Sequence, residues 1–345
     1  MEIKDFINPN KVFIVAELSA NHNGSLEVAK ETIRAAARSG ADAVKLQTYT
    51  ADTMTINSSN NDFIINNGSI WDGQNFYQLY QKAYTPWEWH EELFSLAEED
   101  GLICFSTPFD KTAVDFLENL RNPIYKIASF EITDIPLIEY VASKGKPIII
   151  STGIADDKDI QLALDTIRKH NNHKIILLKC TSSYPAPTEE ANLVTIQDYK
   201  TKFDVIPGLS DHTLGTVTPV VASALGAKVI EKHFILDHSI GGPDASFSLD
   251  EKEFTLMVKN VRDTEKSLGS VIYELTEKQN KGKVFSRSLY VINDVKKGDM
   301  ITNDNVKSIR PGFGLHPKEL VKLFGKKFNN NYKKGTRMSF TMVEN

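Results

Sequence analysis

Short apolar runs rich in β-branched residues alternate with longer amphipathic segments over most of the chain. The runs predict eight strands, at residues 12–16, 43–46, 103–106, 124–127, 147–150, 175–178, 205–209 and 229–230, the last extending toward 234. The segments between them have a helical period and predict helices, for example at residues 26–38, 87–99, 157–170, 217–225 and 251–268. Such alternation is typical of βα units arranged around a parallel sheet.

Eight βα units in roughly 260 residues match a (β/α)8 TIM barrel in both number and length. An open, doubly wound α/β sheet is the alternative arrangement. Ser25 and Asp250 are expected to cap the first and last helices, and Gly40 to end the first. Two longer insertions interrupt the pattern, at 51–85 and 236–249. The first reads as a long loop that either contributes to substrate choice or is a surface loop without function.

The pattern changes after residue 268, where the barrel domain (1–268) is expected to end. Residues 269–284 form a charged, apolar-poor linker, and 285–345 show short alternating runs broken by glycine turns. A weak internal echo, KKGDMIT at 296–302 against KKGTRMS at 333–339, suits a compact fold with two similar halves. The sequence therefore predicts a second, small, β-rich domain.

Polar residues collect immediately after the apolar runs. In a barrel they would all lie on the face where the strands end, which is where barrel enzymes carry their chemistry. The alternative is that strand ends are merely exposed to solvent. The residues concerned are Glu17, Lys45, Gln47, Thr107, Lys126, Ser129, Glu131, Ser151, Lys179, Ser210, His212 and His233.

Among these residues, His212 and His233 are candidate metal ligands, although a single histidine beside a strand is more often a packing residue. Two imidazoles leave coordination positions open for water or substrate, as catalytic metals require. With nitrogen and oxygen ligands, Mn²⁺, Co²⁺ or Mg²⁺ would fit. Cys180 is not expected among the ligands. The lysines and hydroxyls would suit a small anion carrying carboxylate and phosphate, unless each lysine pairs with Glu17 or Glu131.

Composition narrows the class of protein. With 41% hydrophobic and 25% charged residues the chain is globular, and its formal net charge of −5 offers no broad basic surface for nucleic acid. No apolar run approaches the ~18 residues of a membrane span, and the first residues show no basic region followed by an apolar one. Neither membrane insertion nor export is therefore expected. Cys104 and Cys180 make no disulfide framework, so a cytoplasmic protein is expected. Nucleotide-binding loops and the HExxH zinc motif are absent.

Ten ordered motifs resemble the sialic acid synthases, which condense phosphoenolpyruvate with N-acetylated amino sugars to make nine-carbon nonulosonic acids. They cover nearly the whole chain: AELSANHNG (16–24), VKLQTYT (44–50), FSTPFD (105–110), YKIASFE (125–131), STG (151–153), KCTSSYPAP (179–187), GLSDHT (208–213), EKHF (231–234) and SRSLYV (286–291) with SIRPGFGLHP (308–317). AELSANHNG is similar to the pseudaminic acid synthase branch, since other branches more often read AE-x-G-x-NHNG. Ser182 stands where the N-acetylneuraminate enzymes usually have Asn, which bears on the sugar.

The resemblance implies a TIM barrel followed by an antifreeze-like (SAF) domain, and a domain-swapped homodimer in which that domain, through Arg310, completes the partner's site. It implies His212 and His233 as metal ligands, with Mn²⁺ foremost. It places six residues around phosphoenolpyruvate: Lys45, Thr107, Lys126, Ser129, Ser151 and Ser210. Gln47, Tyr184, Asp244 and Arg310 would contact the sugar, and Glu17 or Glu131 would serve as general base.

The expected reaction is metal-dependent condensation of phosphoenolpyruvate with 2,4-diacetamido-2,4,6-trideoxy-L-altrose, with C–O cleavage releasing phosphate. The alternative within the family is an N-acetylneuraminate or legionaminate synthase, using N-acetylmannosamine or its 2,4-diacetamido-6-deoxy analogue. A metal-dependent pyruvate aldolase fits less well, because it needs no phosphate lining. A non-catalytic ice-binding protein would leave the polar strand ends unexplained.

Overall fold

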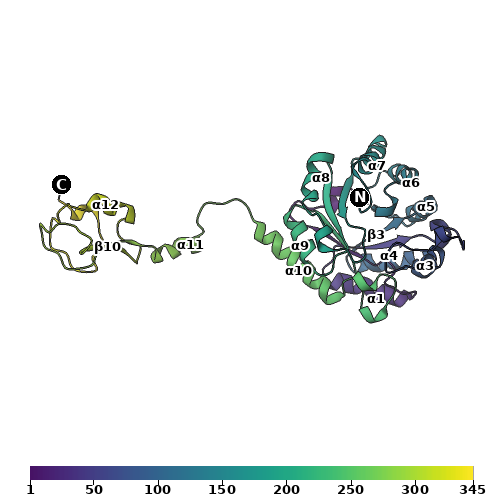
Figure 1. Cartoon of the computed structure of the whole chain (residues 1–345), viewed down its shortest axis with the longest axis horizontal. Coiled ribbons are helices and arrows are strands. Elements are labelled where there is room, and N and C mark those ends of the chain that lie inside the picture. The colour runs from purple at the N-terminus through teal and green to yellow at the C-terminus, as the bar shows by residue number, and fades with distance from the viewer. Residues whose placement is uncertain (345) are drawn as a thin grey trace. The chain divides into compact units, whose positions relative to one another are not determined.

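The computed structural model describes residues 1–344 and divides the chain into two compact units, Met1–Gly269 and Ser270–Asn345. In the first unit eight parallel strands close into a barrel in chain order, with β8 pairing back onto β1 (Figure 1). The strands are β1 (Phe13–Glu17), β2 (Ala43–Thr48), β3 (Ile103–Pro108), β4 (Tyr125–Ile127), β5 (Ile148–Ser151), β6 (Ile175–Cys180), β7 (Ile206–Asp211) and β8 (Val229–His233). The predicted TIM barrel is confirmed, and an open sheet is excluded.

Helices alternate with these strands and cover the outside of the barrel (Figure 1). They are α1 (Leu26–Arg38), α2 (Ala51–Met54), α3 (Phe76–Ala83), α4 (His90–Glu99), α5 (Lys111–Asn119), α6 (Ile135–Ala142), α7 (Asp157–Lys169), α8 (Thr195–Phe203), α9 (Val217–Ala224) and α10 (Glu251–Leu268). The helix predicted at 87–99 is two elements, because a 3-10 turn, Trp87–Trp89, precedes α4.

Local sequence signals set the first and last helices as predicted. Ser25 accepts a hydrogen bond from the backbone N–H of Val28, and Asp250 accepts one from the N–H of Glu253 at the start of α10. Gly40 follows α1 with a φ of +83°, a left-handed conformation that glycine adopts without steric cost. Both predicted helices therefore have the observed bounds.

The barrel interior is apolar in its lower part. One side chain or more from each strand or its flank points inward and packs into a single cluster, and Phe6 and Ile7 from the N-terminal segment close it from below. Gly208 lies where a Cβ would come within 2.6 Å of the Val229 carbonyl oxygen, so only glycine lets β7 and β8 approach this closely. This apolar floor supports the polar layer above it.

Most strands end one or two residues later than the apolar runs predict. Several polar residues expected just after the strands therefore lie within them, because their backbones continue the hydrogen-bonded ladder while their side chains point into the barrel mouth. They are Glu17, Lys45, Gln47, Thr107, Ser151, Ser210 and His233. Lys179 also lies within its strand, but it stands between the inward-facing Leu178 and Cys180, so its side chain faces away from the barrel interior. Ser129 and Glu131 follow β4 in a 3-10 turn, Ser129–Glu131, and His212 follows β7 directly.

The 51–85 insertion is not the plain loop that its composition predicts, since it contains α2, a 3-10 turn (Asn61–Phe63) and α3. Asn75 explains the start of α3, because its side chain accepts hydrogen bonds from the N–H groups of Tyr77 and Gln78. The indole N–H of Trp71 donates to the carbonyl of Pro243, 3.2 Å away. This bond ties the first insertion to the second one, 236–249.

The second unit has its own small core, which includes Leu289, Val306 and Phe328. Its regular strands are β9 (Ser288–Val291) and β10 (Val306–Ile309), an antiparallel pair, and isolated bridges supply the remaining pairing. It also contains α11 (Glu277–Lys281) and α12 (Leu320–Leu323). The segment predicted as a linker, 269–284, thus carries a short helix, and the unit has less regular β structure than expected.

The internal echo of the second unit is visible in its backbone. Gly298 and Gly335 occupy matching places in the two KKG turns, with φ of +88° and +90°. Val295 and Tyr332, each just before its turn, pair with one another in an antiparallel bridge. The two similar sequence segments therefore form two similar turns that meet at one point.

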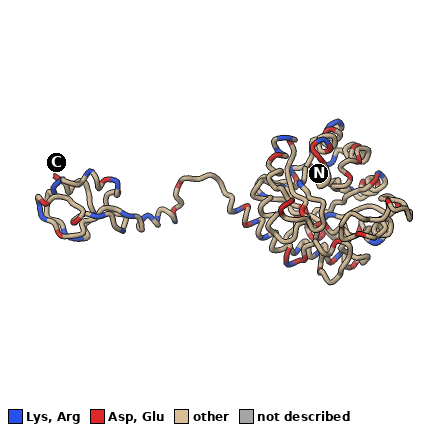
Figure 2. Tube along the Cα trace, in the orientation of Figure 1, with Lys and Arg blue, Asp and Glu red and all other residues tan. Residues whose placement is uncertain are grey.

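Charge is distributed unequally between the units. Lys and Arg number 15 in residues 270–345 against 7 Asp and Glu, whereas the whole chain carries 40 and 45. Along the barrel both signs are interspersed (Figure 2). Within residues 1–344, no helix combines the length and the apolar character that crossing a membrane requires.

Candidate active site

Strand periodicity brings the polar residues together. In a strand, every second side chain points to the same face, and in most barrel strands the last inward apolar residue is followed two positions later by a polar one. Val15 is thus followed by Glu17, and Val229 by Glu231 and then His233. The same relation holds for Lys45, Thr107, Lys126, Ser151 and Cys180, and Ser210 follows Gly208 with the same parity. One polar layer results, directly above the apolar floor.

Two buried lysines converge on one carboxylate in this layer. The ammonium of Lys45 lies 3.0 Å from Glu17 and 3.2 Å from Glu231, and that of Lys126 lies 3.8 Å from Glu231. Lys126 also donates to Ser151 at 2.7 Å, and Ser210 donates to Glu231 at 3.1 Å. The predicted pairing of Lys45 with Glu17 is present. Glu131, the other partner considered, makes no ion pair with a lysine among residues 1–344.

The protonation states follow from burial and these charges. Burial alone would raise the pKa of Glu231, but Lys126 and Lys45 outweigh it, so the pKa is lowered and the group stays ionised. Burial lowers the pKa of Lys126 to about 8, although Glu231 opposes the change. Burial raises the pKa of Glu17 to about 7 against the effect of Lys45. The layer therefore holds two cationic groups with one firmly ionised carboxylate.

His212 and His233 lie beside this layer at the barrel mouth, with ring centroids 5.3 Å apart. Aromatic rings surround them: Tyr184 is 4.3 Å from His212, and Phe247 is 4.9 Å from His233. Trp71 from the first insertion packs against Tyr184 at 5.5 Å. The two histidines therefore share one small site with an aromatic wall contributed by three loops.

The donor atoms of the histidine pair fit a divalent metal ion. His233 Nδ1 is buried without a hydrogen-bond partner, and burial followed by His212 lowers the pKa of His233, which keeps the ring neutral. His212 Nδ1 lies 3.0 Å from the carbonyl of Thr181, which leaves Nε2 free as an acceptor. A carbonyl on the far ring nitrogen is the usual orientation of a histidine that binds metal. These two residues could hold the ion.

A second cluster with metal-ligand chemistry lies outside the barrel mouth, at His238, Asp250 and Glu253. Its groups already have structural partners, because Asp250 and Glu253 form the capping box of α10 and His238 lies 3.4 Å from Glu253. His238 and Glu253 are also exposed to solvent. This cluster is explained by helix capping alone.

Several site atoms are buried and unpaired, although buried polar groups are nearly always hydrogen-bonded. They are Glu17 Oε2, Thr107 Oγ1, Glu131 Oε2, Glu231 Oε2 and His233 Nδ1, of which Glu17 Oε2 and Glu231 lie in ion pairs with Lys45. Ser129 is partly engaged, since it accepts from the N–H of Gly153 at 3.1 Å. Unpaired atoms gathered in one place indicate a site that a polar ligand completes.

The residues expected to contact the sugar are partly assembled. Gln47 and Asp244 are linked through Ser19, and Tyr184 stands over His212. Burial raises the pKa of Asp244. Arg310 is exposed in the second unit, directly after β10. Gln47, Tyr184 and Asp244 therefore lie in the barrel unit, whereas Arg310 lies in the second unit.

Sequence reasoning missed two functional candidates, Glu231 and Ser19, and it left a third, Cys180, out of the site. Glu231 has the same strand parity as His233, a signal that could have found it. Cys180 is inward-facing, and its sulfur lies 3.7 Å from His212 Nδ1. Ser19 has no comparable signal, because its partner Asp244 lies 225 residues along the chain.

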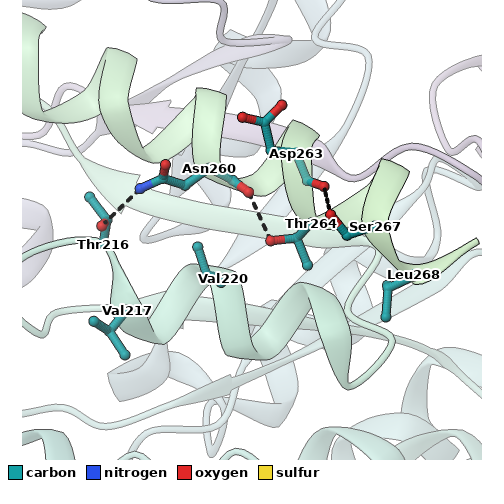
Figure 3. A pocket seen from close by; sticks show the side chains of 8 residues that line it. All are labelled: Thr216, Val217, Val220, Asn260, Asp263, Thr264, Ser267 and Leu268. Atoms are coloured by element: carbon teal, nitrogen blue, oxygen red, sulfur yellow. Dashed lines mark hydrogen bonds between the residues drawn. The ribbon is translucent and has the colours of Figure 1, made fainter. Parts of the chain in front are cut away.

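Of the cavities in the described residues, one of about 500 Å³ lies away from the barrel mouth, between α9 and α10 (Figure 3). Asp263 is the only ionisable group that lines it, and its polar side chains bond within or between the two helices. A second cavity, of about 330 Å³, lies between the two insertions and is lined by Trp71, Lys82 and Pro243 among others. Chemistry is concentrated at the barrel mouth.

Known proteins similar to this chain agree in fold and length. The chain is 50% identical over 335 residues to pseudaminic acid synthase of Campylobacter jejuni, covering 97% of each chain. It is 36% identical over 337 residues to N,N'-diacetyllegionaminic acid synthase of Legionella pneumophila, covering 96% of this chain and 94% of that one. The crystal structure of N-acetylneuraminic acid synthetase from Leptospira borgpetersenii, in complex with citrate, has a TM-score of 0.71 at 32% identity and covers 80% of this chain and 92% of that chain.

A family model, the NeuB family, matches residues 32–273, which include seven of the eight barrel strands. The resemblance drawn from the ten motifs is thereby confirmed. With this match and full-length relatives well above 30% identity, the chain belongs to the NeuB family.

Proposed function

We propose that the protein condenses phosphoenolpyruvate with 2,4-diacetamido-2,4,6-trideoxy-L-altrose to give pseudaminic acid and phosphate. The observation that carries the proposal is the pair of buried ammonium groups, Lys45 and Lys126, converging on Glu231 beside two histidines. The sugar is chosen from the higher identity to a pseudaminic acid synthase, 50%, than to a legionaminic acid synthase, 36%. An N-acetylneuraminate or legionaminate synthase remains the alternative.

Phosphoenolpyruvate is the anion that this layer suits. Its carboxylate and phosphate need cationic and hydroxyl donors, which Lys45 and Lys126 supply with four hydroxyl residues around them. Thr107 Oγ1 is buried and unpaired, and Lys126 and Ser151 already lie in mutual contact. The four residues are Thr107, Ser129, Ser151 and Ser210.

A divalent metal ion, Mn²⁺ foremost and otherwise Co²⁺ or Mg²⁺, would be held by His212 and His233. When bound there, it would polarise the aldehyde of the open-chain sugar toward attack. The residues themselves position the reactants: the lysines hold the anion, and Tyr184 and Phe247 pack against the two histidines.

The proposed chemistry joins C3 of phosphoenolpyruvate to the aldehyde carbon and leaves a cationic centre at C2. Water adds to C2, and phosphate then departs by cleavage of its C–O bond. Glu131 is the proposed base for that water, because its Oε2 is buried and unpaired. Glu17 suits the role less well, since Lys45 and Gln47 already engage its oxygens.

Glu131→Gln is expected to lower kcat by about 10²-fold, the usual contribution of a general base. Burial raises the pKa of Glu131 to about 7 against Lys126, so the carboxylate form is lost as pH falls through 7. The wild-type rate should therefore fall on the acid side of about pH 7, and the variant should lose this limb. Rates of phosphate release from pH 5.5 to 9 check it, with the exposed Glu139→Gln as control. A variant that keeps the acid limb would contradict the assignment.

The reaction itself is tested with three sugars. Purified protein is incubated with Mn²⁺, phosphoenolpyruvate and one of three sugars: the diacetamido-altrose, N-acetylmannosamine or the 2,4-diacetamido-6-deoxy analogue of N-acetylmannosamine. Phosphate release and the mass of the product are measured for each sugar. Faster turnover of either alternative sugar than of the altrose would reject the pseudaminic acid assignment. A product formed from pyruvate, with no phosphate released from phosphoenolpyruvate, would reject the whole reaction in favour of an aldolase.

The second unit is proposed to be an antifreeze-like (SAF) domain, bounded as 285–345 after a linker at 269–284, that completes the partner's barrel in a domain-swapped homodimer. Its excess of basic residues, 15 against 7 acidic ones, suits a cover for a site that binds anions. Arg310 is the proposed sugar contact. The cytoplasmic location expected from the cysteines stays a prediction.

Mixed dimers test the shared site. An Arg310→Ala chain is combined with a His212→Ala chain, each inactive alone, so that one site in the mixture has both intact parts. Partial recovery of turnover is expected, up to about a quarter of wild type if subunits exchange at random. Absence of recovery, with exchange verified by mass, would reject a site built from two subunits.

A further inference from the structure

Ser19 adopts a backbone conformation that serine rarely adopts. Its φ is +45°, in the left-handed region where a Cβ is crowded and glycine is preferred. The residue is 4% exposed, so contact with solvent does not explain it. A strained, buried residue persists when its side chain is needed, and here the side chain is one hydroxyl.

That hydroxyl joins two residues far apart in the sequence. Ser19 Oγ donates to Asp244 Oδ2 and accepts from Gln47 Nε2 at 3.0 Å. The other hydrogen of the Gln47 amide goes to Glu17 Oε1 at 2.9 Å. Both donors of Gln47 and the single donor of Ser19 are therefore used, and the direction of every bond in the chain is fixed.

This direction leaves two oxygens free. Gln47 Oε1 and Asp244 Oδ1 have no hydrogen-bond partner within residues 1–344, and both groups can only accept there. A pair of oriented acceptors at the mouth of a polar site suits a ligand that offers hydroxyl and amide N–H donors. An N-acetylated amino sugar offers both kinds.

We propose that Ser19 determines sugar specificity by holding Gln47 and Asp244 with their acceptor oxygens toward the hydroxyl and amide N–H groups of the amino sugar. Ser19 acts as a positioning residue, through the other two. The inference rests on the proposed function only in taking an amino sugar as the second substrate. Ser19 has no part in the proposed binding of phosphoenolpyruvate, which is assigned to Lys45 and Lys126.

Two substitutions distinguish the effect of the Ser19 hydroxyl from the effect of its backbone conformation. Ser19→Gly removes the hydroxyl and relieves the positive φ, so the variant should melt no lower than Ser19→Ala, which removes the hydroxyl and keeps the crowding. Asn23→Gly is the matched control, because Asn23 has the same φ of +45° in the same loop and is exposed. Its side chain bonds only the carbonyl of Ile240.

Both Ser19 variants are expected to raise the KM for the sugar at least about tenfold, the usual effect of losing an oriented hydrogen-bonding group in a site. The KM for phosphoenolpyruvate should stay within about twofold, and Asn23→Gly should match wild type in both. In the Asp244→Asn background, Ser19→Gly should add less than about twofold, since the two residues act as one unit. An unchanged sugar KM, an equal rise for both substrates, or full additivity would overturn the proposal.

Failure of the Ser19 proposal can be distinguished from failure of the proposed function. The KM values for the sugar and for phosphoenolpyruvate are measured with whichever amino sugar the wild type turns over fastest. If that sugar is not the diacetamido-altrose, the pseudaminic acid assignment is rejected, but the role of Ser19 is still tested. If no sugar is turned over, calorimetric binding of the sugar alditols in the presence of Mn²⁺ replaces the kinetics. Loss of alditol binding in Ser19→Gly, with phosphoenolpyruvate binding retained, supports the role of Ser19. Equal alditol binding by the variant and the wild type, including none by either, overturns it.

Discussion

His212→Ala is expected to abolish bound Mn²⁺ and to lower the rate of phosphate release at least about 10³-fold. A Lewis acid at a reacting carbonyl contributes several kcal/mol, and about 4 kcal/mol corresponds to a factor of 10³. His212 is the better single target of the pair, because Thr181 orients its ring and Tyr184 covers it. Metal content after dialysis and the initial rate of phosphate release measure the two effects.

The fold should survive this substitution. His212 lies just past the end of β7, and its ring bonds the carbonyl of Thr181 through Nδ1, so losing the side chain should cost about 1–3 kcal/mol. The backbone carbonyl of His212, which accepts from the N–H of Ala186, is unaffected by the substitution. Circular dichroism and the melting temperature check it. Because His238 belongs to the exposed cluster with Asp250 and Glu253, His238→Ala is the matched control and should keep both metal and activity. Stoichiometric metal in His212→Ala, or its loss in His238→Ala, would move the metal site out of the barrel mouth.

Periodicity explains why so much of this site is visible in the sequence. A closed parallel barrel forces every second strand residue inward, so eight apolar runs with polar ends already define one polar layer. Lys45, Lys126 and His233 are found in this way. Glu231 was passed over because it stands beside the more conspicuous histidine, although its parity places it in the same layer.

Contacts between distant loops could not be predicted in the same way. Trp71 reaches the aromatic wall only because α3 and its preceding turn fold the 51–85 insertion onto Pro243. Ser19 meets Asp244 across 225 residues, and neither its left-handed φ nor its hydrogen bond leaves a periodic trace. The sequence also predicts most strand ends one or two residues too early. The apolar pattern stops where the side chains become polar, although the backbone hydrogen-bonded ladder continues.

Lys45→Met is expected to raise the KM for phosphoenolpyruvate at least about 10²-fold and to destabilise the protein. The substitution keeps the length of the side chain and removes a buried charge that faces Glu17 and Glu231. Breaking a buried ion pair from one side costs about 3–5 kcal/mol. The lower end applies here, because Lys126 still faces Glu231 and the pKa of Glu17, raised by burial to about 7, lets that group take up a proton.

A loss of about 3 kcal/mol corresponds to a fall of about 6–12 °C in the melting temperature of a unit of this size. Surface ion pairs contribute little to stability. Lys259→Met, which removes an exposed partner of Asp263, should therefore shift the melting temperature by less than about 2 °C. The pH dependence has a definite sign. A carboxyl whose folded pKa is raised contributes stability that is lost as pH rises through that value. Lys45→Met leaves Glu17, with its pKa raised to about 7, without its counter-charge. The loss of stability in this variant should therefore be largest above pH 7.

A double variant separates stability from binding. In Lys45→Met/Glu231→Gln the uncompensated carboxylate is replaced by a neutral amide of the same shape, so a substantial part of the lost melting temperature should return. Phosphoenolpyruvate binding should not return, because the cation itself is missing. If the double variant recovers the KM for phosphoenolpyruvate together with its stability, Lys45 serves only to balance Glu231, and the anion site must be built on Lys126 alone. If the KM stays high while the fold recovers, Lys45 binds the anion directly, and Glu231 is the group that holds both lysines ready for it.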